Sequence, residues 1–272
     1  MMRSLWTAAS GMIAQQNNVD TIANNLSNVN TVGYKTQTAE FKSLLYQEIV
    51  SKTTSANGEN KPVGAQVGLG VRNSSITSHY RQGGFQTTNE PLDVAINGEG
   101  FFAVRMLNGE TAYTRNGNFY LAVAPGGDYM LADSEGLAIL DTNGDAIYFE
   151  QGTVFKDIVI DTEGQICLPD ETGNPQPTGV KLAIFQFSNP SGLEKGTNGL
   201  LLESEASGIA MSEDAYTDLK KSLIKQGYLE MSNVQVADEM VNLIVAQRAY
   251  ELNSKAITTS DEMMQTANNL KR

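Results

Sequence analysis

The side chains most capable of chemistry are few in this sequence, and they do not cluster. His79 is the only histidine, and it lies between Ser78 and Tyr80. A single histidine supplies neither a metal site nor a base paired with a nucleophile, because both need further side chains of matched type. The sequence therefore predicts no catalytic residue at His79.

Cys167 is the only cysteine in the chain. An internal disulfide is therefore excluded, and the cysteine count does not reveal the redox compartment. No basic residue lies beside Cys167 in the sequence to stabilise a thiolate. We expect an unreactive thiol, buried or half-buried in a strand.

One glycine motif resembles a dinucleotide-binding loop. Residues 98–103 match the pattern GxGxxA. In a true binding loop a helix follows and presents its N-terminus to the phosphates, whereas here the apolar residues 101–104 follow and predict a strand. We expect a turn at this place and no cofactor.

A second motif resembles the start of a calcium loop. Asp141, Asn143 and Asp145 have the spacing of calcium ligands. Ala146 stands where the loop needs glycine, and Gly152 stands where it needs the bidentate glutamate. An ordinary Asn-Gly turn explains these residues, so the sequence predicts no metal ion.

The overall charge excludes some classes of partner. The 272 residues carry a formal charge of −12 with a pI near 4.6, and no basic patch is present to meet nucleic acid or an anionic membrane surface. No run of roughly 18 apolar residues predicts a membrane-spanning helix. Charged residues make up only 18% of the chain, which suits a subunit that hides much of its surface.

The elements that must position any functional surface lie at the two ends of the chain. Apolar residues recur there every seven residues, which is typical of helices with a coiled-coil seam. The N-terminal row is Leu5, Met12, Val19 and Leu26, with Ala8, Ile22 and Val29 three residues on; the C-terminal row is Val236, Leu243, Tyr250, Ile257 and Met264, widened by Met240, Ile244 and Val245.

The N-terminal helix is almost without charge. Between Ser4 and Tyr34 the only charged side chain is Asp20, and amides cover the other polar faces. Amides bond one another across a helix contact without the desolvation cost of a buried ion. We expect other helices, from other subunits, to pack around it. A seam within one chain is the alternative interpretation of the C-terminal row.

The helix limits are indicated by their flanking residues. The N-terminal helix is predicted over residues 4–29 and ends in residues 30–33, where Asn and Gly allow left-handed backbone. The C-terminal helix is predicted to begin with Ser232 as N-cap, Gln235 completing a capping box, and a staple between Met231 and Val236. The apolar stretch after Arg3 is too broken for a cleaved Sec signal peptide.

The segment after the first helix is mixed. Phe41, Leu44 and Leu45 have a spacing compatible with a short second helix. Residues 49–64 are rich in Ser, Thr, Asn, Gly and Pro, which predicts an extended arm or hairpin of low intrinsic order.

The central part of the chain changes to a period of two. Short apolar runs alternate with Asn-Gly dipeptides at Asn97, Asn108, Asn116 and Asn143, the strongest hairpin signal. We predict an α+β fold with long terminal helices that form a coiled-coil-like inner domain. A polymerisation domain of residues 1–34 with 232–272 is joined by connecting arms, 35–84 with 206–231, to an antiparallel all-β domain, 85–205.

Three sets of residues stand as continuous motifs in the chain: residues 23–35, residues 93–102 with 113–117, and residues 227–234 with 239–251. In this order they resemble the N-terminal signature, the β-domain and the closing motif of one known family, the bacterial flagellar rod and hook axial proteins. The matching motif positions are Asn24, Asn25, Asn28, Gly33, Tyr34, Ser232, Asn233, Gln247, Arg248 and Tyr250. The first residues, and the long segment before residues 68–72, resemble one rod branch more than the proximal-rod or hook members.

The resemblance implies a structural subunit that is exported through the flagellar type III apparatus and stacked helically. It implies terminal helices in the innermost tube, a β-domain outside them, and a location in the basal body within the cell envelope. The implied partners are copies of the chain, other rod proteins, hook or hook-junction subunits, and bushing ring proteins. No enzyme activity and no cofactor are implied.

The resemblance also directs attention to the arm. We predict that residues 49–63 become ordered only in the polymer, against adjacent subunits, with Ile49, Val50, Pro62 and Val63 as anchors. A proximal rod or hook subunit is the alternative within the family. A secreted β-rich adhesin or enzyme with a helical stalk is the alternative outside it.

Overall fold

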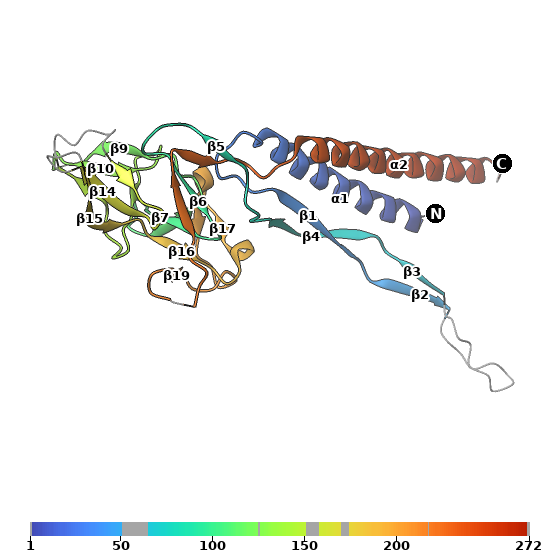
Figure 1. Cartoon of the computed structure of the whole chain (residues 1–272). Helices are drawn as coiled ribbons and strands as arrows, with labels where there is room; N and C mark the ends of the chain where they lie inside the picture. The colour runs from blue at the N-terminus through green and yellow to red at the C-terminus, as the bar shows by residue number, and fades with distance from the viewer. Residues whose placement is uncertain are drawn as a thin grey trace. The chain divides into compact units, whose positions relative to one another are not determined.

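The computed structural model describes residues 2–50, 65–124, 126–150, 158–169, 174–216 and 218–270. The chain divides into two units (Figure 1). Unit 1 contains Met1–Ser27, Gln37–Ser78 and Gln235–Arg272, and unit 2 contains Asn28–Thr36 and His79–Val234. The predicted α+β class is confirmed, with the helices in unit 1 and the larger set of antiparallel strands in unit 2.

Unit 1 combines two long helices with two strand pairs. α1 (Met2–Ser27) and α2 (Val236–Asn269) lie side by side (Figure 1). β1 (Gln37–Ser43) pairs antiparallel with β4 (Val71–Ser78), with a register shift between Glu40 and Phe41. β2 (Tyr46–Val50) pairs antiparallel with β3 (Ala65–Gly68). In the chain β1 is followed by β2 and β3 by β4, so the two pairs lie one after the other along one two-stranded ribbon (Figure 1).

The short helix considered for Phe41, Leu44 and Leu45 is wrong. Phe41 lies in β1 opposite Asn73, and Leu44 donates its N–H to the carbonyl oxygen of Gly70. The main-chain partners of this segment come from about 30 residues downstream, so the apolar spacing of three residues could not reveal them. The pairing of β2 with β3 agrees with a hairpin at the base of the arm. Pro62 and Val63 lie outside the described residues.

The predicted start of the second helix is also wrong. α2 begins at Val236, and its N-cap Gln235 makes no side-chain capping hydrogen bond. Ser232 instead accepts a hydrogen bond from the N–H of Val234 at 3.3 Å. Met231 donates its N–H to the carbonyl oxygen of Gly84. Hydrogen bonds within unit 2 therefore keep residues 231–234 in a non-helical conformation, and the predicted capping box does not form.

Unit 2 is built from short antiparallel strands. Its strands are β5 (Phe85–Thr87), β6 (Val94–Asn97), β7 (Phe101–Arg105), β8 (Thr111–Thr114), β9 (Tyr120–Val123), β10 (Tyr129–Ala132), β11 (Ala138–Ile139), β12 (Tyr148–Phe149), β13 (Val159–Ile160), β14 (Gln165–Pro169), β15 (Pro175–Lys181), β16 (Ile184–Gln186), β17 (Glu194–Lys195), β18 (Leu201–Leu202), β19 (Met211–Ser212), β20 (Leu223–Gln226) and β21 (Tyr228–Glu230). Two 3-10 turns, η2 (Pro190–Gly192) and η3 (Thr197–Gly199), lie between β16 and β18.

The core of unit 2 lies on both faces of β7. Phe102 and Val104 belong to one apolar cluster, and Phe101 and Ala103 belong to the other. Successive side chains of a strand point to opposite faces, so β7 is covered on both sides. β7 pairs with β8, β11 and β16, which makes it the centre of the largest sheet in the described part of the chain.

The segment of residues 206–231, expected as a connecting arm, contributes strands to unit 2. β20 pairs with β6 over four residues, and β21 pairs with β5 over three. β19 pairs with β16. The sequence did not predict these strands, because they are short and partly polar. They are also stabilised by pairing with strands that lie far away in the chain, which no local pattern reveals.

Candidate assembly surface

The two helices of unit 1 are antiparallel and meet at heptad intervals. Ser4 Oγ lies 3.3 Å from Ser260 Oγ, and Asn25 Nδ2 donates to Glu239 Oε2 at 3.2 Å. Between these pairs Gly11 faces Asn253, where an added Cβ would lie 2.9 Å from the amide nitrogen. The seam within the chain therefore consists of small and polar side chains that let the two backbones approach closely.

On α1 each residue of this seam directly precedes a residue of the apolar row that was predicted as the interface. Leu5, Met12, Val19 and Leu26 each follow a residue of the small and polar row, and all four are half-buried. Of the other predicted interface residues, Ile22 is buried and Val29 half-buried. On α2 the buried residues are Glu239, Ala246 and Ser260. Leu243, Ile257 and Met264 are half-buried, whereas Val236, Met240 and Tyr250 are exposed.

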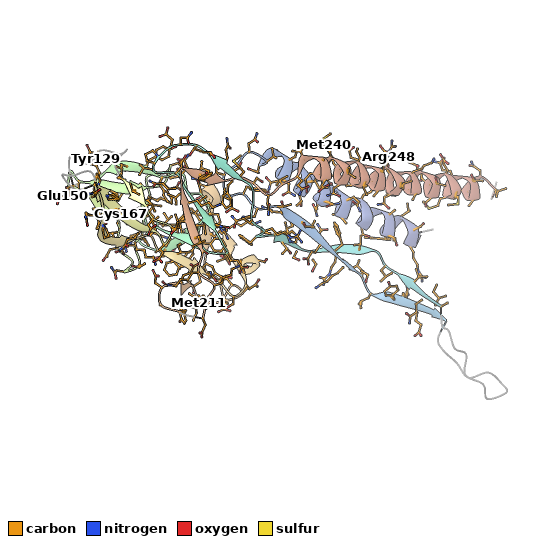
Figure 2. All side chains as sticks on the ribbon, in the orientation of Figure 1. Tyr129, Glu150, Cys167, Met211, Met240 and Arg248 are labelled. Atoms are coloured by element: carbon orange, nitrogen blue, oxygen red, sulfur yellow. The ribbon has the colours of Figure 1, made fainter. Side chains whose placement is uncertain are left out.

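Large apolar side chains remain exposed on both helices. Trp6 is 76% exposed and Ile13 63%, while Val245 on α2 is 62% exposed. Figure 2 labels Met240, another member of this set, on α2. We call these residues the exposed apolar set, and its members are Trp6, Ile13, Val236, Met240, Val241, Ile244, Val245, Tyr250, Leu252 and Met263. Ten large apolar side chains left exposed on the described residues of two helices are more than a folded chain needs at its surface, and exposed apolar area of this kind is typical of interaction sites.

Asn25, one of the motif residues, connects α1 to β1. Its Nδ2 donates to the carbonyl oxygen of Gln37 at 2.8 Å, and its Oδ1 accepts from the Gln37 N–H at 2.9 Å. The side chain is 1% exposed and also contacts Glu239. The amide thus forms with the first residue of β1 the two hydrogen bonds that a neighbouring strand would form. It also connects α1, β1 and α2.

A groove of about 460 Å³ lies beside this connection. It is lined by Asn17, Asp20, Thr21 and Asn24 from α1, Gln37 from β1, and Asn73, Ser74, Ser75 and Ile76 from β4. The Asn73 Oδ1 atom is buried without a hydrogen-bond partner. Asn24, another motif residue, is exposed at this groove.

The remaining motif residues on α2 lie on its surface. Gln247 is exposed, and Arg248, labelled on α2 in Figure 2, forms an ion pair with Glu251 at 2.9 Å. Both partners of that pair are well exposed, so it contributes at most about 1 kcal/mol to stability.

Five motif residues lie in unit 2: Ser232, described above, and Asn28, Gly33, Tyr34 and Asn233, which shape its chain turns. Asn28 Oδ1 accepts from Thr31 Oγ1 at 3.1 Å, and Tyr34 donates its N–H to the Thr31 carbonyl oxygen. Gly33 has a φ of +70°, but α1 already ends at Ser27, two residues before the predicted end of the helix, so Gly33 serves a later chain turn and does not stop the helix. An added Cβ at Gly33 would lie 2.9 Å from the main-chain carbon of Arg115. Asn233 bonds residues of two other segments.

Unit 2 also buries three charges that the sequence did not single out. The Glu230 carboxylate accepts from Lys35 Nζ at 2.5 Å and from Arg115 Nη1 at 3.0 Å, with all three side chains almost fully buried. Burial lowers the pKa of the Lys35 ammonium, and the attraction of Glu230 only partly opposes that shift. The signal was present in the sequence, since all three charges stand inside the family motifs of a charge-poor chain.

The two motifs that resembled binding loops are turns, as expected. Gly98 precedes β7, and no helix follows it. Asp141 Oδ1 accepts the N–H groups of Asn143 and Asp145, which closes an Asn-Gly turn. Within the described ranges no cluster of three or more His, Cys, Asp or Glu side chains is arranged to hold a metal ion. No described helix is long and apolar enough to cross a membrane.

The chain is similar in sequence to proteins of the bacterial flagellum. The family model "Flagella basal body rod protein" matches residues 5–35, "Flagellar hook protein FlgE/F/G D1 domain" matches residues 95–168, and "Flagellar basal body rod FlgEFG protein C-terminal" matches residues 225–270.

Curated relatives cover the whole chain. The flagellar basal-body rod protein FlgG of Borreliella burgdorferi is 44% identical over 100% of both chains. The FlgG proteins of Caulobacter vibrioides and Bacillus subtilis are 40% and 38% identical, over 99% and 100% of this chain and 100% of each relative.

Proposed function

The chain belongs to the family of flagellar basal-body rod proteins and is a structural subunit of the rod, and we propose that it builds the distal rod as a helical tube that transmits motor torque to the hook. Identity over the full length to three FlgG proteins supports the distal position over a proximal-rod or hook role. Membership of a structural family disfavours a stalked adhesin or enzyme.

The observation that carries the polymer proposal is the exposed apolar set of α1 and α2. The intrachain seam uses the small and polar rows, so large side chains such as Trp6, Ile244 and Val245 remain on the surface. Full burial of one such side chain contributes about 1.5–3 kcal/mol before ordering costs. We propose that neighbouring copies cover this set, together with the half-buried predicted rows, in a coiled-coil-like inner tube.

The proposal also assigns partners and a route. The subunit contacts copies of itself, other rod proteins, hook or hook-junction subunits and bushing ring proteins. It reaches the cell envelope through the flagellar type III export apparatus. The chain resembles rod proteins of the basal body over its whole length, and this similarity supports these assignments.

Electron microscopy of the purified full chain under polymerising conditions tests the proposal. We expect straight, stiff tubes. Curved and compressible tubes would favour the hook alternative, and a chain that stays monomeric at all concentrations would contradict a self-assembling rod subunit.

A further inference from the structure

The chain passes between the two units four times. The passages lie between residues 27 and 28, 36 and 37, 78 and 79, and 234 and 235. In unit 2, three segments therefore lead directly to a passage: residues 28–36, the residues from His79 onward, and the residues that end at Val234. Any force applied to unit 2 through the chain enters by these segments.

One side chain, Asn233, bonds all three segments together. Its Oδ1 accepts from the Thr36 N–H at 2.8 Å and from Thr36 Oγ1 at 2.6 Å. Its Nδ2 donates to the carbonyl oxygens of His79 at 2.9 Å and Arg81 at 3.1 Å. The His79 N–H donates to the Thr36 carbonyl oxygen at 2.9 Å. Thr36, His79 and Asn233 each lie within one residue of the end of their segment.

Glu230 bonds the same segments three residues earlier. Its carboxylate accepts from Lys35 Nζ, from Arg115 Nη1 and from the Gly83 N–H at 2.8 Å. Its carbonyl oxygen accepts from the Gly33 N–H at 2.8 Å. The side chain of Glu230 is only 1% exposed, so these groups replace water around its charge.

Arg115 ties this network to the core of unit 2. It directly follows β8, and its Nη2 donates to the Gly98 carbonyl oxygen at 2.7 Å. Its guanidinium also lies over the ring of Phe101, 5.1 Å from the centroid. Phe101 belongs to β7, the central strand. The segments that lead to the passages are therefore bonded to the most buried part of the unit.

Stability alone does not explain a buried triad of charges. Its desolvation penalty is large, and apolar residues of similar volume often give an equal or higher stability. Apolar contacts, however, have no preferred direction, whereas charge-assisted hydrogen bonds fix the geometry of their partners. This network is buried, its hydrogen bonds are directional, and it lies where the chain passes between the units. It is therefore suited to keep the three segments in place when a force acts on them.

We propose that Lys35, Thr36, Arg115, Glu230 and Asn233 form a clamp that transmits force to the core of unit 2, with Glu230 and Asn233 as its positioning residues. The clamp holds the three segments as one cooperative body on the core of unit 2, so that torque passing along the chain reaches that core without slippage. The mechanical part of this inference rests on the proposed function as a rod subunit.

Hydrogen exchange on the full chain tests the cooperative part. Asn233→Ala removes the direct acceptor of the Thr36 N–H only. The clamp predicts that the N–H groups of Gly33 and Gly83, which bond Glu230 and not Asn233, also exchange at least tenfold faster. The amides that pair β7 with β8 should keep their wild-type rates. Acceleration confined to Thr36 would overturn the clamp.

Asn189→Ala is the matched control. Asn189 is an exposed asparagine of unit 2, whereas Asn233 is half-buried, and the Asn189 Nδ2 donates to the Ala206 carbonyl oxygen at 3.0 Å. This variant should leave the exchange of Gly33, Thr36 and Gly83 unchanged, and equal acceleration by the control would overturn the clamp. Glu230→Gln keeps the shape and removes the charge, and it should accelerate the same three amides.

The mechanical part is tested on assembled rods. Rods of Asn233→Ala should form at wild-type length, and their persistence length in electron micrographs should fall at least twofold, whereas rods of Asn189→Ala should match the wild type. Unchanged stiffness in Asn233→Ala rods would overturn the role of the clamp in force transmission. A wild-type chain that forms no rods would refute the proposed function instead, and the exchange comparison decides the clamp without assembly.

Discussion

The side-chain amide of Asn25 pairs with the main chain of Gln37 as a neighbouring strand would, through hydrogen bonds of 2.8 and 2.9 Å. The same amide donates to Glu239 Oε2 at 3.2 Å. One buried residue therefore fixes the end of α1, the start of β1 and the first turn of α2. Its place in the family signature has a structural reason.

Asn25→Asp should destabilise unit 1 by about 2–3 kcal/mol, because a carboxylate loses both donor contacts and faces the Gln37 carbonyl oxygen and the Glu239 carboxylate. Urea unfolding followed by circular dichroism at 222 nm measures the change. Asn24→Asp, one residue earlier and exposed, is the control and should lie within about 0.5 kcal/mol of the wild type. Equal stability of the two variants would refute the role of Asn25.

Gly11→Leu should separate the helices, since even a Cβ at this position would meet Asn253 at 2.9 Å. We expect a loss of about 1–3 kcal/mol, as is usual for an overpacked contact. Gln16→Leu introduces the same side chain on an exposed face of α1 and should have little effect. The seam would have to be reassigned if Gly11→Leu were as stable as the control.

Val245→Asp should abolish assembly and leave the monomer folded, because Val245 is exposed in the chain itself and belongs to the set that neighbouring copies are proposed to cover. Sedimentation and electron microscopy measure assembly, and circular dichroism reports the fold. Leu107→Asp makes the same change at a residue of unit 2 that is 97% exposed, and this control should assemble. Normal tubes from Val245→Asp would place the interface elsewhere.

Deletion of residues 50–62 should leave a chain that folds and polymerises, because the pairs Tyr46–Gly68 and Gln47–Val67 still close the hairpin at its base. The tube should lose its straightness, since this arm is predicted to restrain adjacent subunits. Electron microscopy of the curvature and twist decides the matter, and tubes of unchanged straightness and bending stiffness would contradict the role of the arm.

The stability of unit 2 should depend on Tyr113 in alkali. Burial raises the pKa of Tyr113 from 10.0 to about 12, and the charge of Glu203 adds to the shift. The folded chain therefore keeps a proton that the unfolded chain releases, so the stabilisation is complete below about pH 10 and is lost as the pH rises toward 12. Urea unfolding between about pH 9 and 11 should show a steeper loss in the wild type than in Tyr113→Phe. Parallel curves would contradict this assignment.

The sequence by itself determined the elements whose signals are local. The heptad rows predicted both terminal helices, and the Asn-Gly dipeptides predicted turns such as those at Gly109 and Gly144, which both have a positive φ. The signature residues identified the family, because its motifs stand as continuous runs. The near absence of charge on α1 predicts that helices of other subunits pack around it, and this stays a prediction.

Only the tertiary structure decided which rows meet and where the buried charges lie. Residues seven apart lie on the same face of a helix whichever row is chosen, so the period alone does not tell which row faces the partner helix. In the structure the two helices meet along the row of Ser4 and Gly11, whose small side chains allow close contact, and not along the apolar row. The partners of Glu230 come from segments 115 and 195 residues away, so no local pattern could show the contact. Ser232 failed as a helix cap for the same reason, because main-chain bonds from distant residues outweighed its local preference.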